Sequence, residues 1–121
     1  MKLKLLRFAE AGNLDKERVV LAATDDVDIG KYVVMRSKRG ESGNPRSGSK
    51  SAYWFPDLMV KSGDLVVVYT KKGKSSKKTL ENGKVVHFYY WQLSAAMWGE
   101  SSNNTAVLLN VLEWKHKAPD S

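Results

Sequence analysis

The side chains that could perform acid–base chemistry are few. Histidine titrates closest to neutral pH, and the chain has only two among its 121 residues. His87 lies inside an aromatic run typical of a β-strand, and His116 lies in a polar segment near the C-terminus. We therefore interpret His87 as a packed or half-exposed strand residue and His116 as solvated. Two histidines without suitably spaced carboxylates do not form a zinc site.

An acidic cluster offers a second kind of chemistry. Asp25, Asp26 and Asp28 supply carboxylate oxygens, the ligands that Ca²⁺ prefers. The cluster lacks the central glycine and the distal glutamate of an EF-hand loop, so we interpret it as a solvated turn. The sequence also lacks a nucleophile elbow, a phosphate-binding loop and a dinucleotide fingerprint. These observations predict a protein that is not an enzyme and that uses neither a metal nor a cofactor.

The positive charge is concentrated in two polar segments, residues 36–51 and 71–84. The first contains no apolar residue and the second contains only Leu80. Together they hold 11 of the 20 Lys and Arg residues but only two of the 13 Asp and Glu residues. Both segments are rich in Gly and Ser, which predicts two long, mobile, basic loops. The candidate anion-binding residues are Arg36, Lys38, Arg39, Arg46, Lys50, Lys71, Lys72, Lys74, Lys77, Lys78 and Lys84.

This distribution of charge indicates an anionic partner, of which nucleic acid is the commonest. The formal net charge is +7, so the rest of the chain is slightly acidic. Flexible lysines suit phosphate contact without base readout, because an ammonium group is a point charge without a fixed fork. In the alternative interpretation the loops are merely solvated. The protein is then a protein–protein adaptor or a small structural subunit that binds through a sheet face or edge.

The elements that must position these residues are β-strands. Short runs rich in Val, Tyr, Phe and Trp alternate with turn-forming residues. The runs cover residues 2–8, 18–23, 32–35, 53–55, 65–69, 85–91 and 106–112. Only residues 92–98 are compatible with a short helix. The pattern predicts one all-β domain over residues 1–121, with about seven to nine strands and a polar tail at residues 115–121.

The composition bears on the compartment in which the protein is expected. The absence of cysteine excludes disulfides and thiolate metal sites. No apolar run approaches the ~20 residues that span a bilayer, so we expect no transmembrane insertion. The apolar part of the N-terminus is interrupted by Arg7 and Glu10, unlike that of a signal peptide. We expect a cytoplasmic protein.

Aromatic residues admit two interpretations. Those that could stack on nucleic-acid bases are Tyr53, Trp54, Tyr89, Tyr90, Trp91 and Trp98. Large residues also fill the core of a two-sheet sandwich, and we favour this role for Phe55 and Trp98. Strand alternation places His87, Tyr89 and Trp91 on one face and Phe88 and Tyr90 on the other, and we expect one of these sets to be partly exposed.

Three segments in order resemble the lamin tail domain. Residues 19–34 have the form strand, acidic turn, Gly30, aromatic residue, strand. Residues 53–68 place Phe55-Pro56 before a glycine turn at Gly63 and a Val-rich strand. Trp91 is followed by Trp98-Gly99, a polar turn and the apolar run at 106–110. The resemblance covers about residues 17–112.

The resemblance implies an immunoglobulin-like β-sandwich that serves as an interaction module. Physical reasoning about two of its positions agrees. Pro56 lacks an N–H and should end the strand at Phe55, and Gly63 and Gly99 can take the positive φ that a tight turn needs. The fold does not by itself name the partner, because function is carried by sites placed on folds.

Overall fold

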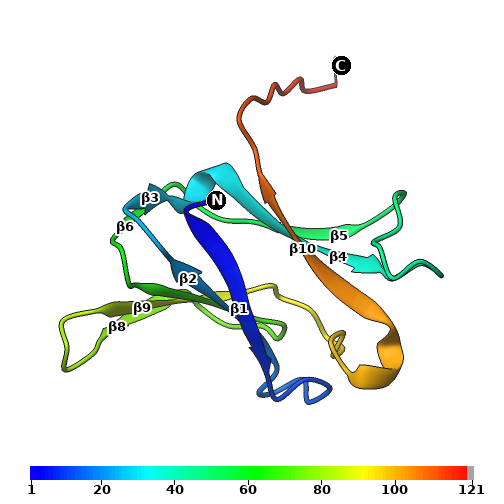
Figure 1. Cartoon of the computed structure of the whole chain (residues 1–121), viewed down its shortest axis with the longest axis horizontal. Coiled ribbons are helices and arrows are strands. Elements are labelled where there is room, and N and C mark those ends of the chain that lie inside the picture. The colour runs from blue at the N-terminus through cyan, green and yellow to red at the C-terminus, as the bar shows by residue number, and fades with distance from the viewer. Residues whose placement is uncertain (120–121) are drawn as a thin grey trace.

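The computed structural model describes residues 1–119 and is all-β, with ten strands and two short 3₁₀ helices among these residues (Figure 1). The strands are β1 (Leu3–Ala9), β2 (Arg18–Ala23), β3 (Val27–Asp28), β4 (Tyr32–Lys38), β5 (Ser51–Trp54), β6 (Met59–Val60), β7 (Leu65–Tyr69), β8 (Ser76–Thr79), β9 (Val85–Tyr90) and β10 (Asn104–Asn110). The helices are η1 (Ile29–Lys31) and η2 (Glu100–Ser102). The count of ten exceeds the predicted seven to nine because it includes β3 and β6, which have only two residues each.

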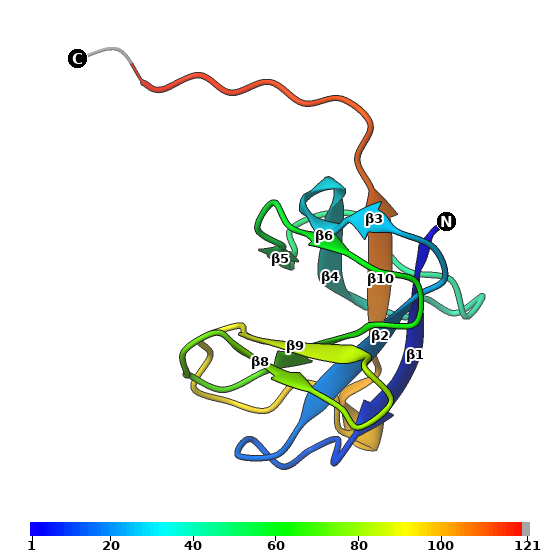
Figure 2. The same cartoon turned by 90° about the vertical axis from the view of Figure 1, so that its left-hand side faces the viewer.

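The strands form two main sheets that pack against each other (Figure 2). The larger sheet has the order β1-β2-β7-β9-β8 and the smaller has the order β10-β4-β5, while β3 pairs with β6. Every pair is antiparallel except β7 and β9, which run parallel in the middle of the larger sheet. The two sheets therefore have one inner face each, which forms the core, and one outer face each.

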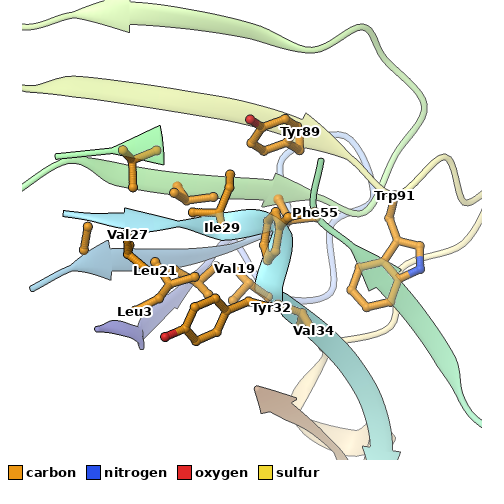
Figure 3. Packing of buried hydrophobic residues seen from close by; sticks show 14 of the residues in the cluster. Leu3, Val19, Leu21, Val27, Ile29, Tyr32, Val34, Phe55, Tyr89 and Trp91 are labelled. Carbon is orange, nitrogen blue, oxygen red and sulfur yellow. The ribbon is translucent and has the colours of Figure 1, made fainter. Parts of the chain in front are cut away.

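The inner faces are apolar because β-strands alternate their side chains. Leu21 and Val66 of the larger sheet are fully buried, as is Val34 of the smaller sheet. Phe55 and Tyr89 contact each other edge-on within the core, with 5.8 Å between their ring centroids (Figure 3). The predicted core positions of Phe55 and Trp98 are confirmed, with 2% and 7% of each residue exposed.

The alternation predicted for β9 is also confirmed. His87, Tyr89 and Trp91 are buried, whereas Phe88 and Tyr90 are half-buried on the opposite face. β5 ends at Trp54, two residues before Pro56, and Gly63 has a φ of +91°. Gly99 does not take the positive φ that we expected: its φ is −58°, and Asn103 supplies the left-handed residue of that turn at +59°.

One predicted local structure is wrong, and one that the sequence allowed does not form. Residues 71–84 are not one loop, because Ser76–Thr79 form β8 and pair with β9 along the edge of the larger sheet. Backbone pairing at a sheet edge needs no apolar side chain, so the polar sequence concealed this strand. Residues 92–98 form no helix, because the N–H groups of Met97 and Trp98 bond to the carboxylate of Glu17.

Candidate nucleic-acid interface

The outer face of the larger sheet gathers cations from distant parts of the sequence. Paired residues in neighbouring strands point to the same face, so the register fixes which side chains lie together. Lys4 of β1 shares a row with Ala22, Leu65, Val86 and Lys78 of β8, and Arg7 shares the next row with Val20, Val67 and Phe88. Arg18 shares the third row with Tyr69 and Tyr90.

A fifth cation comes from the turn after β7. The ammonium group of Lys71 lies 5.3 Å from the ring centroid of Tyr69, on the same side of the sheet as that ring. We call this surface the basic face and define it by Lys4, Arg7, Arg18, Lys71 and Lys78. None of the strand residues that the register places on this face is Asp or Glu. The strands therefore contribute only positive charge to this face.

Beneath these cations lies a small apolar cluster of its own. Val20, Val67 and Val86 are 3%, 4% and 8% exposed, although they point away from the main core. Partly buried Leu65 and Phe88 pack against them, with Tyr69 and Leu80 at the sides of the cluster. Long cationic side chains flank the valines in the sheet and can lay their methylene stems over them. The basic cations therefore project from a part of the sheet that has its own packed apolar cluster.

The aromatic residues of this face form a closed stack. The rings of Tyr69 and Tyr90 are 5.2 Å apart and nearly parallel, with 12° between their planes. The guanidinium carbon of Arg18 lies 5.5 Å from the centroid of Tyr69. Gly73 packs against Tyr90 so closely that a Cβ there would lie 2.4 Å from the ring. We call Arg18, Tyr69, Tyr90 and Gly73 the stack.

Gln92 holds the last member of the stack in place. Its Oε1 accepts from the N–H of Gly73 at 3.1 Å, and its Nε2 donates to the carbonyl of Gly73 at 2.7 Å. These two bonds fix the turn that carries Lys71 and Lys72. The requirement for glycine is steric, because any larger residue at this position would displace the tyrosine ring.

A buried carboxylate fixes the same end of the sheet. Glu17 is 0% exposed. Its Oε1 accepts from the N–H groups of Gly12 and Trp98, and its Oε2 accepts from the N–H of Met97 and the hydroxyl of Thr70. Burial raises the pKa of Glu17, but the four hydrogen bonds together outweigh this effect, so the pKa lies below its ordinary value. Glu17 thus stays ionised and joins three loops.

A second buried carboxylate fixes the other end. Asp64 is 5% exposed and accepts from the N–H groups of Lys61 and Val85 at 3.0 Å each. The Nε2 of His87 lies 3.5 Å from Asp64 Oδ2. Burial raises the pKa of Asp64, but these neighbours lower it more, so the net shift is downward. Both carboxylates have structural partners, and neither faces an open catalytic cleft.

The structure separates the candidate anion-binding residues into groups. Lys71 and Lys78 lie on the basic face, and Lys72 and Lys74 are exposed in the turn before β8. Lys77 pairs with His87 and so points to the opposite side of the sheet. Lys84 donates to the carbonyl of Ser62 at 2.9 Å. Strand β8 therefore divides the second basic segment between two sides of the sheet.

The first basic segment lies elsewhere. Arg36 and Lys38 belong to β4, and Arg39, Arg46 and Lys50 follow in the loop that connects β4 to β5. Lys38 and Lys50 use their ammonium groups to bond backbone carbonyls of Ser102, Ser47 and Ser49. Figure 1 shows this loop and the β8–β9 hairpin at opposite ends of the molecule. The two predicted basic loops do not form one surface.

Three cations of the basic face were missed by the sequence prediction. Lys4, Arg7 and Arg18 lie in strands that read as ordinary apolar runs. A β-bulge between Leu5 and Arg7 brings Lys4 and Arg7 to the same side, because it adds one residue to β1 relative to β2. Strict alternation would have placed two residues three positions apart on opposite faces.

The acidic cluster is engaged in turns. Asp28 Oδ1 accepts from the N–H groups of Gly30 and Leu58 at 2.9 and 3.1 Å, and Asp26 accepts from Ser62. Asp25 lies 3.8 Å from the ammonium of Lys2. Residues 1–119 contain no group of three or more His, Cys, Asp or Glu arranged to hold a metal ion. The same residues include no helix long and apolar enough to cross a membrane.

The outer face of the smaller sheet has a different character. Leu109, Val33 and Trp54 share one row, and Val107, Met35 and Ala52 share the next. We call these six residues the apolar face. Trp54 is 50% exposed, and its ring meets that of Trp114 edge-on at 5.0 Å. The segment after β10, which carries Trp114, extends beyond the body of the domain (Figure 2).

Comparison with known proteins gives no family assignment. No family model matches the chain, and no curated protein or solved structure matches it. The structure itself defines an all-β protein of two packed sheets with one cationic and one apolar outer face.

Proposed function

We propose that the chain is a non-enzymatic binding module that holds nucleic acid on the basic face. The observation that carries the proposal is the convergence of five cations from β1, β2, β8 and the turn after β7 on a sheet face whose strands contribute no carboxylate. A single-sign surface attracts a polyanion and neutralises its phosphates. The resemblance to the lamin tail domain, an immunoglobulin-like interaction module, supports a binding role of this kind.

The proposal predicts a steep dependence on salt. Each phosphate neutralised on duplex DNA contributes about −0.9 to the slope of log K against log [salt]. Five engaged cations give a slope of about −4.5, which corresponds to a loss of about 500-fold in affinity between 50 and 200 mM salt. Fluorescence anisotropy with a labelled 16-base-pair duplex measures this slope.

A pair of matched variants tests where the ligand lies. K4T/R7T/K78T removes three exposed cations from the basic face, and R39T/R46T/K50T removes three from the β4–β5 loop. Both lower the net charge equally. We expect the first variant to reduce the slope to about −2 and the second to leave it unchanged. Equal losses in both variants would show that only the net charge matters, and absence of binding by the unaltered protein at 50 mM salt would rule out the proposal.

A second candidate function has its own supporting observation. The apolar face exposes Trp54 and Leu109, and contiguous exposed apolar residues on a small domain are typical of protein contacts. In this alternative the chain is a protein–protein adaptor or structural subunit, and its cations serve solubility. Light scattering distinguishes the two functions: a mass that rises with protein concentration and falls on substitution of Trp54 by Ser favours the adaptor.

A further inference from the structure

The rings that a sheet would normally offer to nucleic-acid bases are already covered in this protein. A base stacks on an aromatic residue by lying against the face of its ring. One face of Tyr69 is against Tyr90, and the cations of Arg18 and Lys71 lie over the ring at 5.5 and 5.3 Å. Tyr90 stacks on Tyr69 and also packs closely against Gly73.

Opening this arrangement would break several contacts at once. A base entering between Tyr69 and Tyr90 would have to separate two rings that are nearly parallel at 12°. A base entering on the other side of Tyr90 would have to displace Gly73, which Gln92 holds with two hydrogen bonds. Phe88 is the remaining aromatic residue of this face, and it is half-buried against the valine cluster.

The cations remain available where the ring faces do not. Lys4, Arg7 and Lys78 are exposed and form no ion pair within residues 1–119, so their charge faces solvent. Phosphate contact needs charge and reach, whereas base stacking needs an open ring face. The basic face supplies long, charged side chains but no open ring face.

We propose that the basic face recognises the phosphodiester backbone of double-stranded nucleic acid and does not stack bases. This inference rests on the proposed function and narrows it to one class of ligand. A duplex presents one charge per about 1.7 Å of axis and keeps its bases stacked inside, so it gives the most phosphate contact without exposing bases. A single strand has lower charge density and gains affinity mainly from stacking, which this surface does not provide.

The dimensions of the sheet set the length of the site. Five strands at about 4.8 Å spacing span about 19 Å from β1 to β8. Duplex DNA rises about 3.4 Å per base pair, so this width covers about six base pairs. Saturation of a long duplex should therefore approach one protein per about six base pairs, with no dependence on base sequence because phosphate contacts carry none.

Four labelled ligands of equal length test the inference by anisotropy at 50 mM salt. They are a mixed-sequence 16-base-pair duplex, a dT16 strand, a dA16 strand and a 16-unit abasic deoxyribose-phosphate strand. We expect the duplex to bind tightest and the abasic strand to bind within about twofold of dT16 and dA16. Stacking of even one base would favour dT16 or dA16 over the abasic strand by about fivefold or more.

One variant checks the aromatic ring outside the stack. Phe88→Leu keeps an apolar side chain on the valine cluster but removes the ring. We expect its affinity for dT16 to stay within twofold of that of the unaltered protein. A larger loss, a clear preference for dT16 or dA16 over the abasic strand, or tighter binding of a single strand than of the duplex would overturn the inference while leaving nucleic-acid binding intact. Failure of all four ligands to bind would instead overturn the proposed function itself.

Discussion

The outer face of the larger sheet buries the valines of its inner strands under neighbouring apolar and aromatic residues, whereas the outer face of the smaller sheet leaves its apolar residues partly exposed. Val20 and Val67 are only 3% and 4% exposed, although they point away from the core. Leu109 and Trp54, on the outer side of the two edge strands of the smaller sheet, are 37% and 50% exposed. Two outer faces of one domain therefore differ strongly in how completely they are covered.

The difference follows from the neighbours in each row. On the basic face Val20 is paired with Arg7 and lies two residues from Arg18, so long stems flank a short branched side chain. On the apolar face both rows contain only apolar residues, and Lys115 and His116 of the C-terminal segment lie beside Val33 and Trp54. The valines of the basic face are thus covered by Leu65, Tyr69 and Phe88 while the neighbouring cations charge the surface. The exposed apolar rows of the smaller sheet need another part of the chain or another molecule to cover them.

The largest expected effect comes from the carboxylate that holds one end of the basic face. Glu17→Ala leaves three buried donors without their acceptor, namely the N–H groups of Met97 and Trp98 and the hydroxyl of Thr70. Each unsatisfied buried donor costs roughly 1–3 kcal/mol, so we expect the free energy of unfolding to fall by at least about 3 kcal/mol at pH 7. Urea denaturation measures the loss.

The dependence of this loss on pH gives the control. The pKa of Glu17 is lower in the folded protein than its ordinary value of 4.5, so its stabilisation is complete above that value and is lost as the pH falls through the folded pKa. The difference between the unaltered protein and Glu17→Ala should therefore narrow below about pH 4.5. A difference that stayed constant at lower pH would show that the side chain acts through packing and not through its charge.

A smaller effect on stability is expected from a pair of matched substitutions, one on each outer face. Val67→Ala removes methyl groups from a buried site under the basic face, which should cost about 2 kcal/mol. Val107→Ala makes the same change on the apolar face, where the residue is only half-buried, and should cost less than about 1 kcal/mol. The ratio of the two losses in urea denaturation measures how differently the faces are covered. Equal losses would mean that the apolar face is as well covered in solution as the basic face.

Local patterns in the sequence were enough to predict much of this fold. The Val-rich and aromatic runs predicted the main strands, because β-branched and aromatic residues suit a half-buried pleated surface. Alternation correctly separated Tyr89 from Tyr90, since that period depends only on neighbouring residues. The polar strand β8 escaped detection because its pairing with β9 involves the backbone alone.

The candidate site depends on information that no local pattern holds. Lys4 and Lys78 share one face of the sheet because the order and register of the five strands place them in one row, at opposite edges. Arg7 joins them only because of the bulge in β1. Glu17 reads as one more charged residue before a strand, and its burial follows from three loops that converge on it. Charge counts found the basic segments but could not assign them to surfaces.

The smallest expected effect concerns the part of the apolar face that the C-terminal segment contacts. Trp54 and Trp114 meet edge-on at 5.0 Å while both remain at least half exposed, at 50% and 57%. An aromatic pair of this geometry contributes about 0.5–1.5 kcal/mol beyond its burial, and exposure places this pair at the low end. A double-mutant cycle with Trp54→Ala and Trp114→Ala should therefore give a coupling energy of about 0.5 kcal/mol in urea denaturation.

A coupling near zero would mean that the segment does not rest on the sheet in solution and that the apolar face is open along its whole length. A coupling above about 1.5 kcal/mol would instead mean that the segment covers this face as completely as the valines of the other face are covered, and the contrast between the two faces would disappear.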